Sequence, residues 1–136
     1  MIQSVDSFKL ANEISKRSLL AGIVTDCLVE VNIGGEESKS GISPERLEEL
    51  LCQASELPGI KIKGLMTIPP ICDDEVQLNK YFSKMHRIFI DIKDKNLDNT
   101  DIQIMSMGMS GDYEAAIQNG SNLVRIGSAF FGPRLY

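Results

Sequence analysis

Hydrophobic and polar positions follow two alternating patterns along the chain, one typical of strands and one typical of helices. Short apolar runs rich in β-branched residues predict five strands, at 1–5, 27–33, 59–68, 101–107 and 122–130. Apolar residues three or four positions apart predict four helices between them, at 6–18, 44–55, 73–93 and 112–119. Because a helix lies between each pair of successive strands, the strands should be parallel and covered by helices.

Two α/β architectures are compatible with five such strands. The strands could form an open sheet with helices on both faces, or they could be an incomplete part of an eight-stranded TIM-type barrel. The length of 136 residues fits one domain, and no linker, repeat or low-complexity segment divides it. We therefore expect a single domain over residues 1–136.

The acidic balance of the chain limits the partners that it can bind. Its formal net charge at pH 7 is −5, whereas nucleic acids and anionic membranes attract positively charged surfaces. We expect neither partner, and a bound anion would have to be held locally by backbone amides or a single arginine.

Cysteine content and the lack of targeting signals indicate the compartment. Cys27, Cys52 and Cys72 lie far apart and form no CxxC pair, which is typical of reduced thiols in a cytosolic protein. The sequence has no basic-then-apolar leader and no apolar run of membrane-spanning length. We expect a cytoplasmic protein.

Two glycine-bearing turns lie close together near the end of the chain. SMGMSG at 106–111 follows one predicted strand and opens a helix, and RIGS at 125–128 ends the last strand. Free backbone N–H groups at such positions suit a phosphate or a carboxylate, and barrel folds build a phosphate site after their last two strands. The two turns therefore predict a phosphate site.

The same residues also have a purely structural interpretation. Ser110 and Asp112 would cap a helix, while Gly108 and Gly127 would form tight turns. Arg125 would then make only a surface salt bridge. Spacing alone does not decide between the two interpretations.

Other chemistry has less support in the sequence. His86 is the single histidine and lies in a predicted helix away from its apolar stripe, so we expect a solvated side chain. Without a second histidine or a cysteine pair, no zinc site is predicted. A Ser/His/Asp arrangement is not predicted either, because this histidine has no placed partners.

Five phrases together resemble the pyridoxal phosphate homeostasis protein family, whose members form a single alanine-racemase-like barrel. The phrases are IQSVDSFKLANEI, VEVNIGGEESKSGI, GLMTIPP, SMGMSGDYEAAIQNG and VRIGSAFFG, in this order over essentially the whole chain. The resemblance implies a partial TIM-type barrel and a non-catalytic carrier that holds pyridoxal 5′-phosphate at the barrel mouth.

The resemblance also implies roles for individual residues. Ser106 and Ser110 of SMGMS, with Gly127 and Ser128 of RIGS, would receive the phosphate. Two neighbours, Met107 and Gly108, would shape the first turn. Arg125 would face the cofactor, toward either its ring nitrogen or its phosphate.

Members of this family also have an N-terminal portion whose lysine forms an aldimine with the cofactor. The chain resembles only the C-terminal portion, so we expect about three βα units, roughly two-fifths of the family's length, to be absent. Lys39 is the one lysine expected in a loop at the carboxyl ends of the strands, and we expect it to be solvated. The resemblance thus implies non-covalent binding without catalysis.

An incomplete barrel would leave two open edges and an unclosed apolar interior. Exposed strand edges pair readily with another chain, so we expect a homo-oligomer. Two alternatives stay open: a truncated, self-associating half-barrel fragment that binds little ligand, and a racemase-like enzyme. The enzyme would require a Schiff-base lysine and an acid/base pair that the sequence does not show.

Overall fold

The computed structural model describes residues 1–95 and 97–132, and its elements follow the predicted alternation of strand and helix. They are β1 (Ile2–Val5), α1 (Phe8–Leu20), β2 (Thr25–Glu30), the 3-10 helix η1 (Pro44–Arg46), α2 (Leu47–Ser55), β3 (Ile60–Met66), α3 (Glu75–Asp94), β4 (Thr100–Met109), α4 (Tyr113–Gln118), β5 (Leu123–Arg125) and α5 (Ser128–Phe131).

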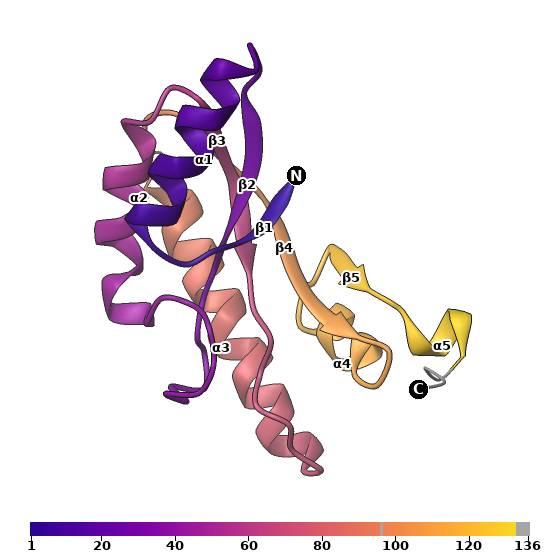
Figure 1. Cartoon of the computed structure of the whole chain (residues 1–136). Coiled ribbons are helices and arrows are strands. Elements are labelled where there is room, and N and C mark those ends of the chain that lie inside the picture. The colour runs from indigo at the N-terminus through magenta and orange to yellow at the C-terminus, as the bar shows by residue number, and fades with distance from the viewer. Residues whose placement is uncertain (96, 133–136) are drawn as a thin grey trace.

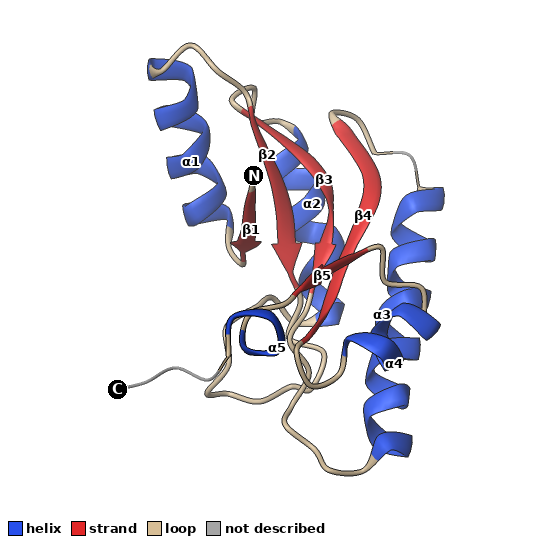
Figure 2. Cartoon of the chain, turned by 90° about the vertical axis from the view of Figure 1, so that its right-hand side faces the viewer, coloured by secondary structure: helices blue, strands red, loops and turns tan. Residues whose placement is uncertain are grey.

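The strand order decides between the two architectures that the sequence allowed. All neighbouring strands are parallel, and their order in the sheet is β1-β2-β3-β4-β5. Each crossover therefore advances in the same direction, and right-handed crossovers that never reverse place their helices on one face. Helices α1, α2 and α3 lie along one side of β2 to β4, and β5 curls away on the other side (Figure 1). The chain is a half-barrel, with β1 and β5 at its two open edges (Figure 2).

The last predicted strand and the number of helices need correction. Among the described residues there are five α-helices rather than four, because Ser128–Phe131 forms a helix where the sequence predicted strand. Met109 pairs with Arg125 at the point where β4 itself ends. Residues beyond Arg125 consequently have no ladder partner, and the amides of Phe130 and Phe131 bond the Gly127 carbonyl instead (3.0 and 2.9 Å).

The hydrophobic core lies between the sheet and its covering helices. One side of each central strand contributes to this layer, for example Val29, Leu65 and Met105, which are at most 1% exposed. The helices contribute their apolar stripes, with Leu51 and Phe82 fully buried. The helical periodicity read from the sequence therefore marks the faces that pack on the sheet.

The concave face of the half-barrel is more polar than expected. Side chains alternate along a strand, so the residues between the core positions point to the opposite, concave side. These residues include Asp26, Leu28, Glu30, Lys61, Lys63, Met66, Asp101 and Ser106. Lys63 pairs with Asp101 near the amino ends of the strands. The expectation of an unclosed apolar interior was wrong, because charged and hydroxyl groups separate the apolar ones.

The end of α4 is formed by a glycine and involves His86. Gly120 has a positive φ of 92° and the Ser121 N–H bonds the Ala116 carbonyl (3.0 Å), which closes the helix with a left-handed C-cap. His86 Nδ1 donates to the carbonyl of Asn119 (2.8 Å). His86 is therefore a half-buried contact between α3 and α4 rather than a solvated side chain.

Gly64 provides a test of how closely the central strands approach. A Cβ atom at this position would lie 1.8 Å from the backbone oxygen of Ile104 on β4, which cannot move without breaking the ladder. We expect Gly64→Ala to lower the free energy of unfolding by about 3 kcal/mol in urea denaturation. Gly111→Ala is the control, since nothing lies within 4 Å of its Cβ position, and it should change stability by less than about 0.5 kcal/mol. Equal midpoints for the two variants would contradict this account of the sheet.

Candidate functional site

The two glycine-bearing turns meet at the carboxyl ends of β4 and β5. The Ser110 hydroxyl accepts hydrogen bonds from the backbone N–H groups of Gly127 and Ala129, both at 3.1 Å. The first turn of α5 thus directs two amides toward one oxygen atom. A Cβ at Gly127 would meet nothing within 4 Å, so a ligand can approach its backbone closely. The Ser128 side chain is exposed beside these amides.

The first turn differs in detail from its expected shape. β4 continues to Met109, so Met107 is a fully buried core residue rather than part of a turn. Gly108 has a φ of 97°, and a Cβ there would lie 2.6 Å from that of Ala116. Asp112 does not cap α4 with its side chain; its carboxylate accepts the Met109 N–H (2.6 Å) and tightens the turn.

Ser106 lies below these turns and is fully buried on the concave face. Its hydroxyl donates to the Oε1 atom of Gln3 on β1 (2.8 Å) and accepts from the Nη1 atom of Arg125 (2.5 Å). The side chain therefore links the first, fourth and fifth strands. Its expected contact with a phosphate remains a prediction. In this structure the hydroxyl already donates one hydrogen bond and accepts another.

Arg125 extends from β5 across the ends of the neighbouring strands. Its Nη1 atom also donates to the Ser106 carbonyl (3.3 Å), and its Nη2 atom donates to the Thr67 carbonyl (3.2 Å). Burial lowers the pKa of the guanidinium, while Glu30 and Asp112 act in the opposite direction. No ion pair involves Arg125 among residues 1–95 and 97–132. The surface salt-bridge interpretation was therefore wrong, and neutral acceptors hold this cation.

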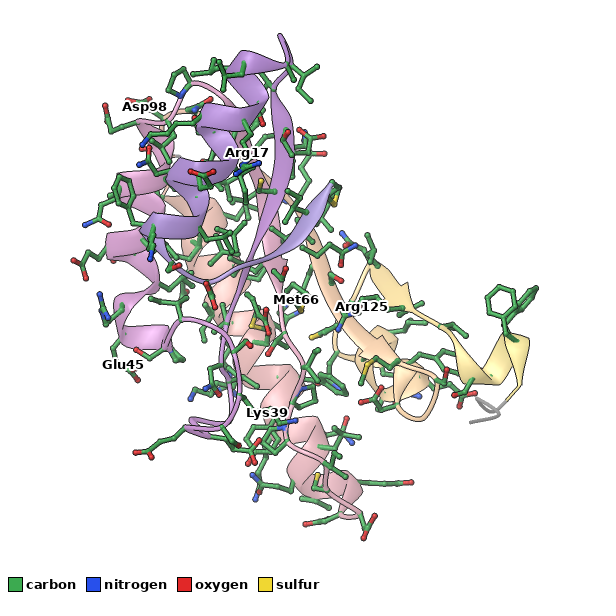
Figure 3. The ribbon with its side chains drawn as sticks, viewed as in Figure 1. Arg17, Lys39, Glu45, Met66, Asp98 and Arg125 are labelled. Carbon is green, nitrogen blue, oxygen red and sulfur yellow. The ribbon has the colours of Figure 1, made fainter. Side chains whose placement is uncertain are left out.

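Glu30 belongs to the same surface and was missed in the sequence. It is aligned with Met66 on β3, which in turn is aligned with Ser106 on β4. The Arg125 and Met66 side chains lie close together near the carboxyl ends of the strands (Figure 3). Glu30 is only 9% exposed, but its carboxylate oxygens are not sealed from water, because no buried side-chain oxygen or nitrogen in the described part of the chain lacks a hydrogen-bond partner. An acidic residue inside the apolar run CLVEV was the available signal.

The environment of Glu30 disfavours its charged form. Burial raises the pKa of this carboxyl above its usual value of 4.5, and the nearby Asp6 raises it further, while Arg125 acts in the opposite direction. An acid that is costly to ionise in the folded chain does not stabilise the fold at neutral pH.

Lys39 lies where the sequence predicted, in a loop at the carboxyl ends of the strands. Lys39 is exposed in the loop after β2, away from Arg125 (Figure 3). Asn32 closes this loop by donating to the Glu36 carbonyl (2.8 Å). Lys63 pairs with Asp101 at the opposite end of the strands, so neither lysine contacts the residues of the two turns.

The described part of the chain offers neither a metal-binding cluster nor a membrane-spanning helix. No group of three or more His, Cys, Asp or Glu side chains is arranged to hold a metal ion, as far as residues 1–95 and 97–132 show. None of the helices described has the length and apolar character needed to cross a bilayer.

Known proteins with this arrangement identify the family. The family model for the alanine racemase N-terminal domain matches residues 1–134. The chain belongs to this family. It is also 44% identical, over its full length, to the pyridoxal phosphate homeostasis protein of Aquifex aeolicus, and covers 59% of that protein. The resemblance to the pyridoxal phosphate homeostasis protein family is confirmed, but not the expectation that it concerns the C-terminal portion only. The chain spans a little more than half the length of the curated relatives it matches.

Solved structures show the same fold. The structure of PipY from Synechococcus elongatus without PLP is 27% identical, with a TM-score of 0.89, and 96% of this chain matches 60% of that one. The PLP-bound form of PipY is 26% identical, with a TM-score of 0.84. Alanine racemase from Clostridium difficile shares only the fold, at 19% identity over 36% of its chain and a TM-score of 0.73.

The raised pKa of Glu30 predicts how stability depends on pH. The stability associated with neutral Glu30 is present below pH 4.5, its usual pKa, and is lost as the pH rises through the higher folded value. Glu30→Gln should therefore unfold at a higher urea concentration than the original chain at pH 7, and this advantage should shrink toward pH 4. Asp6 and Arg125 are unchanged in both proteins. A variant that is less stable at pH 7 would show that the carboxylate stabilises the fold.

Proposed function

We propose that this protein binds pyridoxal 5′-phosphate without a covalent bond and serves in the homeostasis of that cofactor, not in catalysis. One observation carries the proposal: the amides of Gly127 and Ala129 converge on a single oxygen atom beside the un-neutralised Arg125. Two converging N–H groups and a nearby cation are the donors that a phosphate group requires. The names of the curated relatives and PLP-bound PipY support this choice of phosphate ester.

The donor set assigns roles within the site. Ser110 occupies the position that a phosphate oxygen would take, and would rotate away or share the amides when the ligand binds. Gly127 and Ser128 would hold the phosphate with an N–H and a hydroxyl. Arg125 would face the cofactor from β5, held by the hydroxyl and carbonyl of Ser106. Met107 and Gly108 would set the path of β4 and would not contact the ligand.

The cofactor supplies an electrophilic aldehyde and an electron-accepting ring when it is bound. The residues of the two turns bind and orient a phosphate ester, and none of them is a lysine or an acid/base pair. Lys39 is exposed and flanked by Glu36 and Glu37 in its loop. This is why we prefer a carrier to a racemase-like enzyme, and the curated relatives are named as homeostasis proteins rather than enzymes.

Ligand binding can be tested by titration and chemical trapping. We expect pyridoxal phosphate to bind saturably, inorganic phosphate to compete with it, and borohydride reduction to leave the intact mass unchanged. Ser128→Ala should weaken both ligands by about tenfold, since a hydrogen bond to a charged group is lost. Ser4→Ala is the matched control, because Ser4 is an exposed hydroxyl on β1 away from the turns.

Two outcomes of this titration contradict the proposal. A reduced covalent adduct would show that a lysine of this chain reacts with the aldehyde, which favours the enzyme-like alternative. An absence of binding by both ligands would favour the alternative of a self-associating fragment with little ligand binding.

We also propose that the protein forms a homo-oligomer in the cytoplasm through its open edges. Phe130 and Phe131 on α5 pack edge to face at 5.0 Å and are 79% and 82% exposed. The opposite edge exposes Leu20, Ile23 and Val24 at the end of α1. Apolar groups beside unpaired strand edges favour association with another edge.

Light scattering tests this association. The protein should have at least twice the monomer mass at micromolar concentration, and changing both Phe130 and Phe131 to Ser should shift it toward monomer. Ile71→Ser is the control, since Ile71 is 93% exposed but lies in the loop before α3. A monodisperse monomer of the original chain would refute the proposal.

A further inference from the structure

The face of α3 that is turned away from the sheet carries apolar side chains at its ends and cations between them. Side chains three or four positions apart share one face of a helix, and this face carries Val76, Lys80, Ser83, Arg87 and Ile90. Val76 is 63% exposed and Ile90 is 40% exposed. The row from Val76 to Ile90 is about 21 Å long, since an α-helix rises about 1.5 Å per residue.

A groove follows this row and continues toward α4. Its first part has a volume of about 600 Å³ and is lined by Val76, Asn79, Lys80, Ser83, Lys84 and Arg87. Its second part, of about 410 Å³, shares Ser83 and Arg87 with the first and includes Ile117 of α4, which is 51% exposed. We call the two parts together the α3 groove.

The polar groups at the base of the α3 groove already bond one another. The Asn119 side chain accepts from the Ser83 hydroxyl (2.6 Å) and donates to the Asn79 carbonyl oxygen (2.7 Å). His86 bonds the Asn119 carbonyl (2.8 Å). A small polar ligand would therefore find few free partners at the base, and the exposed cations and apolar side chains remain available for recognition.

The charges around the α3 groove have one sign. Lys80, Lys84 and Arg87 line it, no carboxylate is among its lining residues, and none of the three cations forms an ion pair within residues 1–95 and 97–132. Lys84 also borders the groove of the loop after β2, together with Glu45. Lys80 and Arg87 are thus the cations that a ligand of the α3 groove can neutralise.

We propose that the α3 groove docks an acidic, amphipathic segment of another protein. Carboxylates of the segment would face Lys80 and Arg87, and its apolar side chains would cover Val76 and Ile117. An amphipathic helix of about four turns matches the length of the row, and such a helix binds by laying its face into a groove. This docking surface is separate from the proposed phosphate site.

The balance of charge favours a protein segment over a nucleic acid. The chain has a net charge of −5, so a long polyanion is repelled by the rest of its surface. A short acidic segment experiences mainly the cations within about 8–10 Å, the screening length at moderate salt. The exposed Val76 and Ile117 also favour a partner with apolar side chains.

Fluorescence anisotropy with a designed peptide tests this docking. The probe is a fluorescein-labelled helical peptide of about four turns, with glutamates at its centre and a leucine near each end. We expect saturable binding, and we expect the double variant Lys80→Gln and Arg87→Gln to weaken it about fivefold at low salt, because two exposed charge pairs are lost. This difference should vanish at about 1 M salt.

Two control variants separate specific docking from general attraction. Lys9→Gln combined with Lys16→Gln removes the same charge from two exposed α1 lysines that are seven positions apart, as Lys80 and Arg87 are, and should change the affinity by less than twofold. Ile117→Ser should weaken the peptide about threefold at both salt concentrations, since it removes apolar contact. All variants should keep the thermal unfolding transition and the affinity for pyridoxal phosphate of the original chain.

Four results would overturn the proposal. The acidic peptide could fail to bind the original chain, or the α1 double variant could weaken it as much as the α3 double variant does. A single-stranded oligonucleotide that binds the α3 groove more tightly than the peptide would identify a polyanion site instead. A lower mass of the α3 double variant in light scattering would identify a second copy of this chain as the occupant.

Discussion

The one-directional parallel ladder from β1 to β5 is the constraint on which the rest of the structure depends. Each strand needs a helical crossover to reach the next, and crossovers of one hand in one direction place every covering helix on the same face. The carboxyl ends of the strands consequently collect at one end of the sheet, where their loops converge. The same constraint leaves the concave face and both edges without helical cover (Figure 1).

The composition of the concave face explains how a half-barrel can exist with that face uncovered. Charged pairs such as Lys63 with Asp101 lie near the amino ends of the strands, and the hydroxyl and guanidinium of Ser106 and Arg125 lie near the carboxyl ends. Such groups tolerate water, so the uncovered surface costs less than an apolar one would. The apolar exposure is greater at the edges, at α5 and at the end of α1.

The candidate site combines backbone amides with two charged side chains, Arg125 and Glu30. Backbone amides at the start of α5 offer a position for an oxygen atom, which the Ser110 hydroxyl fills in this structure. Arg125 is held by Ser106 and Thr67, so its geometry is set before any ligand arrives. Glu30 lies on the same surface, where burial and Asp6 raise the pKa of its carboxyl and Arg125 acts in the opposite direction.

The sequence by itself determined the order of elements, the parallel strands and the family, because periodicity and motifs are local properties of the chain. It also placed Ser110, Arg125 and Gly127 at adjacent strand ends. It could not choose between an open sheet and a half-barrel, since that depends on strand order. It missed α5, where the ladder ends with β4, and it missed Glu30. The partners of Ser106 and Arg125 come from β1 and the end of β3, and only tertiary structure brings strands so distant in sequence together.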